Sequence, residues 1–119
     1  MAKQSQVTVE RRGDVAILSI LCRSMDEPAA QQLHDDGLAA SSEGPTRALV
    51  VDMSKVEFAP SVALGAFIRL AQALKLSGQR LVIVGVTQRV HGTFSVTRLD
   101  KVLERAPTRD DALRMLGAV

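Results

Sequence analysis

The chain has 119 residues, of which 46% are hydrophobic and 24% are charged, and these values are typical of one globular domain. Its three Phe residues, with no Trp or Tyr, exclude the aromatic stacking platforms that bind single-stranded nucleic acid. The formal net charge of +2 arises from scattered Lys and Arg residues, with no run longer than the pair Arg11 and Arg12. We therefore expect a solvated surface and no nucleic-acid partner.

The first predicted elements are two short strands joined by a tight turn. Residues 1–6 show no apolar pattern, and we expect them to be disordered. Val7 and Val9 begin the first strand, and Val15–Ile20 form the second. The tripeptide Arg-Gly-Asp at 12–14 has the composition of a hairpin turn, so the sequence predicts an N-terminal antiparallel hairpin.

A helix and a buried strand are expected after the hairpin. Asp26–Ala40 carries a loose helical stripe of Ala and Leu, and Pro28 lies near its start, where a first helical turn tolerates proline. Ser, Gly and Pro residues then interrupt the pattern over 41–45. Ala48–Asp52 is a short and continuous apolar run, which is typical of a strand buried on both faces in the middle of a sheet.

The second half of the chain repeats this alternation. Ser61–Leu76 is predicted to be a strongly apolar helix that ends before Gly78, and Leu81–Val84 a second buried strand. The remaining expected elements are a short helix over Thr87–Val96, a short strand over Lys101–Leu103 and a final helix over Thr108–Leu116, capped by Thr108 with Asp111. This order predicts an α/β fold: a mixed, mostly parallel sheet of four to five strands, covered by about four helices, with the hairpin at one edge.

The single cysteine and the lack of long apolar segments bear on the compartment. Cys22 has no second cysteine with which to form a disulfide within the chain, which indicates a reducing compartment. The sequence shows neither the pattern of a signal peptide nor an apolar run of membrane-spanning length. We therefore expect a soluble, cytoplasmic protein without direct membrane insertion.

The residues that could serve an enzyme are few and scattered. His34 precedes two aspartates, but adjacent helical residues point in different directions, so a solvated helix face is the expected interpretation. His91 has no carboxylate or cysteine near it in the sequence, and Cys22 ends a predicted strand. The glycines have neither the spacing nor the lysine of a phosphate-binding loop. We therefore expect no catalytic residue, no cofactor and no metal site.

The junction between the Ala48–Asp52 strand and the Ser61–Leu76 helix is the main candidate site. Ser61 lies at the entrance of that helix, where two interpretations stay open. It is either an N-cap that satisfies a free backbone N–H, or a phosphoacceptor, because a helix N-terminus favours an anion. Leu64 and Ile68 lie beside the main apolar stripe of the helix, and they either complete the core or stay partly exposed for a partner.

Several segments resemble the STAS domain, which anti-sigma factor antagonists and sulphate transporters share. VVDMS at 50–54 and VEFAPSVALG at 56–65 are similar to the family patterns hhhDhS and VxFhDSSGLG, where h is a hydrophobic residue. GQRLVIVGV at 78–86, SVTRLDK at 95–101 and DDAL at 110–113 look like later family segments, and Asp26 matches the acidic residue that opens the first helix. The resemblance extends from about Val7 to Leu116 and implies a single STAS domain over residues 7–117.

The resemblance implies a regulatory function rather than an enzymatic one. In anti-sigma factor antagonists, a kinase-fold anti-sigma factor phosphorylates the serine of this motif, and only the unphosphorylated antagonist binds the kinase and releases the sigma factor. Carried over by position, the phosphoacceptor is Ser61. The partner-binding residues around it are Asp26, Pro60, Val62, Leu64 and Ile68. The implied protein is a bacterial, cytoplasmic regulator of transcription and signal transduction, and a monomer or weak dimer.

Two departures from the family motif keep a second function open. Pro60 stands where the family has aspartate, and Val62 where it has a second Ser or Thr. Proline removes both a carboxylate and a backbone N–H from the site. The alternative is a constitutive, non-phosphorylated STAS module that acts as a scaffold in a stress-signalling complex or as a cytosolic subunit of a lipid-transport ABC complex.

Overall fold

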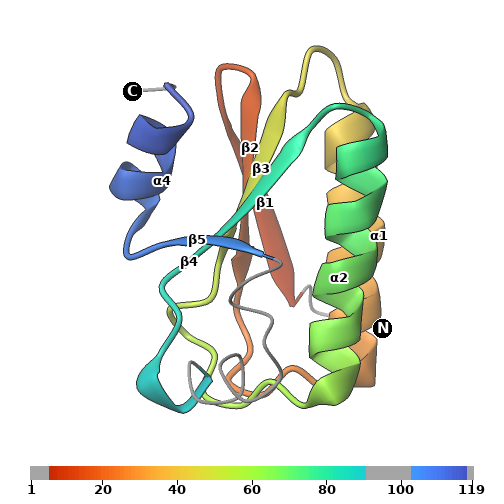
Figure 1. The fold of residues 1–119 in the computed structure, drawn as a ribbon. Helices are drawn as coiled ribbons and strands as arrows, with labels where there is room; N and C mark the ends of the chain where they lie inside the picture. The colour runs from red at the N-terminus through yellow and green to blue at the C-terminus, as the bar shows by residue number, and fades with distance from the viewer. Residues whose placement is uncertain (1–5, 91–102, 118–119) are drawn as a thin grey trace.

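The computed structural model describes residues 6–90 and 103–117, which are organised around one mixed β-sheet (Figure 1). Its five strands lie in the order β1-β2-β3-β4-β5; β1 and β2 form an antiparallel hairpin, and the neighbours from β2 to β5 are parallel. The predicted α/β class with its N-terminal hairpin is confirmed. The elements are β1 Val7–Arg12, β2 Val15–Ile20, α1 Glu27–Ser42, β3 Ala48–Asp52, α2 Ser61–Leu76, β4 Arg80–Val84, β5 Glu104–Ala106 and α4 Arg109–Met115.

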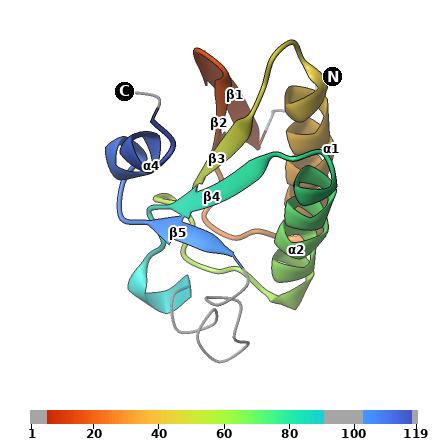
Figure 2. The same cartoon turned by 45° about the horizontal axis from the view of Figure 1, so that its top comes forward.

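The helices lie in layers on opposite faces of the sheet. α1 and α2 run side by side over one face, and α4 lies against the other (Figures 1 and 2). Parallel strands need crossover connections, and these place helices over the sheet. The central strands β3 and β4 are therefore buried on both faces, which explains why their sequences are continuous apolar runs rather than alternating ones.

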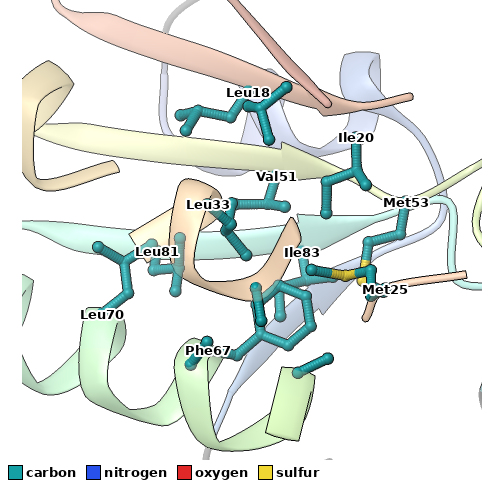
Figure 3. Packing of buried hydrophobic residues seen from close by; sticks show 14 of the residues in the cluster. Leu18, Ile20, Met25, Leu33, Val51, Met53, Phe67, Leu70, Leu81 and Ile83 are labelled. Atoms are coloured by element: carbon teal, nitrogen blue, oxygen red, sulfur yellow. The ribbon is translucent and has the colours of Figure 1, made fainter. Parts of the chain in front are cut away.

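The larger core cluster lies between the sheet and the pair α1 and α2. Figure 3 shows Leu33 of α1 with Phe67 and Leu70 of α2 facing Val51 and Ile83 of the central strands. All five side chains are completely inaccessible to solvent. The apolar stripe predicted for α2 is therefore a core face. Burial of a side chain of this size contributes about 1.5–3 kcal/mol to stability.

A second, smaller cluster lies on the opposite face of the sheet, under α4. The helix and the residue after it contribute Ala112, Leu113 and Leu116. The strand residues beneath them are Val15, Ile17, Ala48, Val50, Val82, Val84 and Ala106. A short helix with one apolar stripe thus excludes water from the second face of the central strands.

Local signals in the sequence mark the element boundaries correctly. Gly13 adopts a φ of 62° in the hairpin turn, a backbone conformation that glycine reaches without strain. Asp26 is the N-cap of α1, since its Oδ1 accepts a hydrogen bond from the Ala29 N–H (3.0 Å). Thr108 caps α4 in the same way by accepting from the Asp111 N–H (3.2 Å), as predicted.

The predicted strand over Lys101–Leu103 is wrong in its position. The last strand is β5, Glu104–Ala106, whereas Leu103 lies in a bend before it and residues 101–102 lie outside the described residues. Apolar character was the misleading signal, because Leu103 is buried in the larger core cluster while β5 is a half-exposed edge strand with two charged residues. Of the helix expected over Thr87–Val96, residues 88–90 are helical and residues 91–96 lie outside the description.

Candidate functional site

Three segments distant in the sequence meet at the loop between β3 and α2. The N–H groups of Glu57 and Phe58 both donate to the Arg23 carbonyl oxygen, at 2.6 and 3.1 Å. The Met25 N–H donates in turn to the Phe58 carbonyl oxygen at 2.9 Å. Arg89, from the segment after β4, lies over the Phe58 ring. The loop is therefore held as a short extended segment beside residues 23–25.

The loop and the first turn of α2 present apolar side chains to solvent. Phe58 is 58% exposed and Val62 40% exposed, and Pro60 between them is also exposed. The guanidinium carbon of Arg89 lies 5.7 Å from the centre of the Phe58 ring, within the range of a cation–π interaction. An open hollow of about 780 Å³ adjoins Phe58 and Pro60; its other lining residues are Ser24, Glu57, Ala59 and Arg89. We call Phe58, Pro60 and Val62 the Phe58 patch.

An ion pair lies at the rim of the Phe58 patch. Arg23 donates from its Nε to a carboxylate oxygen of Glu57. This hydrogen bond and the charge of Arg23 hold the pKa of Glu57 below its ordinary value, and the nearby charge of Arg89 acts in the same direction. Because the Arg23 side chain is 82% exposed, the pair adds little to stability and leaves its charges available at the surface.

The backbone at the start of α2 bears on one of the two roles considered for Ser61, that of an N-cap. Pro60 is the N-cap, with a φ of −68° and a ψ of 172°, and Ser61 is the first residue of the helix. The Pro60 carbonyl oxygen accepts from the N–H groups of Ala63 (2.9 Å) and Leu64 (3.3 Å). The interpretation of Ser61 as an N-cap is therefore wrong, because the helical hydrogen bonds begin one residue earlier. Pro60 makes no side-chain cap hydrogen bond to α2, and the first turn of the helix carries no acidic residue.

The predicted partner-binding residues have different environments. Pro60 and Val62 belong to the exposed Phe58 patch, and Asp26 is an exposed residue whose carboxylate caps α1. Leu64 is only 3% exposed and packs in the larger core cluster. Ile68 is half-buried farther along α2, beside a separate hollow. The structure thus groups Pro60 and Val62, and places Leu64 in the interior.

Sequence reasoning did not single out Phe58 and Arg89, although both belong to the site. Phe58 is one of only three aromatic residues in the chain and stands in a loop next to proline. That position in an aromatic-poor sequence was a usable signal, since exposed aromatics are enriched in protein interfaces. No local pattern marks Arg89, because its proximity to Phe58 depends on the tertiary fold.

Of the other candidate residues, those that the structure describes show no arrangement suited to catalysis. His34 is partly buried, with its Nδ1 3.7 Å from Asp35 Oδ1, and His91 lies outside the described residues. Burial raises the pKa of the Cys22 thiol, which disfavours the nucleophilic thiolate. Within residues 6–90 and 103–117, no cluster of His, Cys, Asp or Glu has three members able to hold a metal. None of the helices in these ranges has the length and apolar character that crossing a membrane requires.

Solved structures similar to this chain share its fold over nearly their whole length. A STAS domain protein from Planctomyces limnophilus, described as an anti-sigma-factor antagonist, has a TM-score of 0.82 and 22% identity, covering 98% of this chain and 100% of its own. An anti-sigma factor antagonist from Mycobacterium paratuberculosis has a TM-score of 0.79 and 29% identity. The match covers 92% of this chain and 91% of that one. A Ser-to-Glu form of RsbS from Moorella thermoacetica has a TM-score of 0.81 and 21% identity. The match covers 95% of this chain and 96% of that one.

Sequence comparison points to the same family. No curated protein sequence matches this chain. A family model described as "Mlab, STAS domain" matches residues 7–104, which is well over half of the sequence. With the strand order and the loop geometry described above, the match confirms the expected family: the chain belongs to the STAS domain family.

Proposed function

We propose that this protein is a regulatory, non-enzymatic binding module of the anti-sigma factor antagonist type, and that its Phe58 patch binds an anti-sigma factor with a kinase fold. The observation that carries the proposal is the exposure of Phe58, at 58%, beside Pro60 and Val62 on a loop held by backbone hydrogen bonds. An exposed aromatic side chain next to arginines has the composition of an interface hot spot. Similarity to an anti-sigma factor antagonist at 29% identity supports the same function.

Phosphorylation of Ser61 is the proposed means of regulation. Ser61 is the first residue of α2, adjacent to Pro60 and Val62 of the patch. The first turn of α2 has no acidic residue and its N-cap Pro60 makes no side-chain cap hydrogen bond, and a helix N-terminus favours an added anion. A phosphoserine carries about −1.5 to −2 charges at pH 7, and an apolar contact would have to desolvate that charge. The modified protein would keep its fold and lose its partner.

The proposal extends to the setting in which the protein works. We infer that residues 7–117 act as one STAS domain, as a monomer or weak dimer in the bacterial cytoplasm, where kinase-fold anti-sigma factors hold sigma factors. The role would be one in transcription regulation and signal transduction, with no cofactor. Exposed binding residues on one loop, rather than a chemically equipped cavity, support a binding role.

Binding measurements with purified kinase-fold anti-sigma factors of the source bacterium test the proposal. Phe58→Ala should weaken binding at least about tenfold, since truncation of a hot-spot residue costs about 2 kcal/mol or more and about 1.4 kcal/mol corresponds to tenfold. Leu76→Ala is the matched control, because Leu76 is 90% exposed at the other end of α2 and should bind as the wild type does. Equal affinity of Phe58→Ala and the wild type would show that the Phe58 patch is not the binding surface.

Intact-protein mass spectrometry after incubation with kinase and ATP tests the regulation. The wild type should gain one phosphate, and Ser61→Ala none. Ser61→Asp should bind the kinase more weakly than the wild type does. If no kinase-fold anti-sigma factor phosphorylates the wild type, regulation through Ser61 is wrong, and the binding proposal then depends on the affinity measurements alone.

A constitutive STAS module is the second candidate function. The family model described as "Mlab, STAS domain" supports it, as do Pro60 and Val62, which replace the residues that frame the phosphorylated serine in the family pattern. The module would serve a stress-signalling scaffold or a lipid-transport ABC complex. Co-purification of a transporter ATPase with the tagged protein, retained in Ser61→Asp, would favour this function over the phosphorylation-gated one.

A further inference from the structure

Arg109, the first residue of α4, connects three strands on the face of the sheet opposite α1 and α2. Its Nε lies 2.6 Å from Asp52 Oδ2, its Nη1 lies 2.7 Å from Glu10 Oε1, and its Nη2 donates to Ser19 Oγ. Glu10, Ser19 and Asp52 belong to β1, β2 and β3 respectively. The planar guanidinium presents several N–H groups in a fixed arrangement, so one side chain serves all three acceptors.

Asp52 transmits this contact to the loop that leads to the Phe58 patch. While its Oδ2 faces Arg109, its Oδ1 accepts a hydrogen bond from the Ser54 N–H at 2.9 Å. The Asp52 side chain is only 13% exposed, whereas its two partners, Ser54 and Arg109, are more accessible to solvent. Gly85 packs against the same turn. Its backbone φ is +70°, and a Cβ added to this residue would lie only 3.0 Å from the Ser54 nitrogen. The turn at Ser54 is therefore packed on one side and hydrogen-bonded on the other.

The turn continues directly into the loop. The Val56 N–H donates to the Met53 carbonyl oxygen (2.9 Å), and the Thr87 hydroxyl donates to the Val56 carbonyl oxygen (3.1 Å). Phe58 follows, with its N–H bound to the Arg23 carbonyl oxygen. The loop thus has two anchors: Arg23 holds its second half, and Asp52 holds its first half with the help of Arg109.

We propose that Arg109 is a positioning residue for the partner-binding loop, acting through Asp52 and the Ser54 turn without touching the Phe58 patch. The proposal deepens the proposed function and rests on it, because the loop is the one that carries the patch. According to this proposal, the position of α4 and the conformation of the loop depend on each other through Arg109 and Asp52. Partner affinity would then depend on a helix that lies on the other face of the sheet.

Amide hydrogen exchange of the free protein tests the positioning role directly. Arg109→Met keeps much of the aliphatic stem and removes all three polar contacts. Exchange at residues 53–58 should rise by about tenfold or more, the change expected when a charge-assisted hydrogen bond that limits local opening is lost. Exchange in the centre of β3, at residues 49–51, should stay unchanged if the protein is not globally destabilised. Arg109→Lys, which keeps the charge without the planar fork, should produce a smaller rise and is the milder variant if Arg109→Met does not fold.

The control is Arg80→Met, which removes another arginine–carboxylate contact, that of Arg80 Nε with Glu104 Oε2 (3.1 Å), at the start of β4. It should leave exchange at 53–58 as in the wild type. If Arg109→Met raises exchange only in α4, or nowhere, Arg109 does no more than dock its own helix and the inference is overturned.

Affinity for the kinase-fold anti-sigma factor provides the functional readout. Arg109→Met should weaken it by several-fold although Arg109 makes no contact with the patch. Unchanged affinity alongside raised exchange would overturn the link to binding. A wild type that binds no kinase would instead contradict the proposed function, while the exchange data would still decide whether Arg109 positions the loop.

Discussion

At the scale of single residues, Asp52 shows how burial and hydrogen bonding oppose each other. Burial of the carboxylate by itself raises its pKa, but the hydrogen bonds from the Ser54 N–H and from Arg109 more than offset this effect, and the pKa lies below its ordinary value. The charged form is thus the one that the fold stabilises. Asp52 therefore stabilises the native state more when it is ionised than when it is protonated.

A pH series on Asp52→Asn tests this conclusion. At pH 7 we expect the variant to lose about 1.5–3 kcal/mol of unfolding free energy, the range for a hydrogen bond to a charged group. Because the folded pKa is lowered, the Asp52 contribution should be complete above the ordinary aspartate pKa of about 3.9 and disappear as the pH falls through the lower folded value. Urea unfolding followed by circular dichroism should therefore show the difference between the two proteins narrowing below about pH 4.

The matched control is Asp14→Asn. Asp14 also pairs with an arginine, Arg47, at 2.6 Å, but its side chain is 42% exposed. Solvent screening should limit the cost at pH 7 to at most about 1 kcal/mol. A constant difference between Asp52→Asn and the wild type from pH 7 to pH 3 would show that the Asp52 charge plays no part in stability.

At the scale of elements, the packing of α1 against α2 depends on a missing side chain. Gly37 is buried in the interior of α1, and a Cβ there would lie 2.7 Å from Leu70 Cδ2 and 2.9 Å from Leu70 Cδ1. Leu70 is itself fully buried in the core cluster, so it has little room to move away. The two helices approach closely at this point because Gly37 has no side chain.

We expect Gly37→Ala to lower the free energy of unfolding by about 1–2 kcal/mol, because overpacking exceeds the gain in helix propensity. The control is Gly65→Ala in α2, where the nearest atom to a new Cβ is Arg69 Nη1 at 3.5 Å. That substitution should raise stability by about 0.5–1 kcal/mol. Urea unfolding of both variants measures the two changes in stability. Stabilisation of the same size in both variants would mean that Leu70 can move to accommodate the added methyl group without cost.

At the scale of the whole molecule, α4 covers the second face of the sheet. Its Leu113 and the following Leu116 lie in the same cluster as Ile17, Val50 and Val82 of three strands. Each large side chain in such a cluster contributes about 1.5–3 kcal/mol by burial. Total stabilities of domains are about 5–15 kcal/mol, so the sheet depends on α4 for cooperative folding.

Removal of residues 108–119 should therefore abolish cooperative thermal unfolding, increase binding of a hydrophobic dye such as ANS, and promote aggregation. Met115→Ala is the control, since Met115 lies in α4 but is 45% exposed, and its cost should stay within about 0.5 kcal/mol. Dye fluorescence and thermal melts by circular dichroism are measured for the truncated protein and for Met115→Ala. A truncated protein that melts cooperatively without binding dye would contradict this role of α4.

The sequence by itself determined the elements whose signals are local. Continuous apolar runs identified β3 and β4, Pro28 marked the start of α1, the Thr108 cap marked the start of α4, and the turn at Gly13 identified the hairpin. These features depend on periodicity and backbone preference within a few residues. The STAS resemblance rested on the order of the same segments, and the family match confirms it.

Only the tertiary structure decided which side chains near Ser61 face solvent. The helical pattern left Leu64 and Ile68 open, and the packing of α2 buries Leu64 while leaving Ile68 half-exposed. The stacking of Arg89 on Phe58 joins segments that are far apart in the chain, as does the contact of Arg109 with Asp52. Such contacts depend on how the sheet and the helices pack together, and no local pattern in the sequence encodes that arrangement.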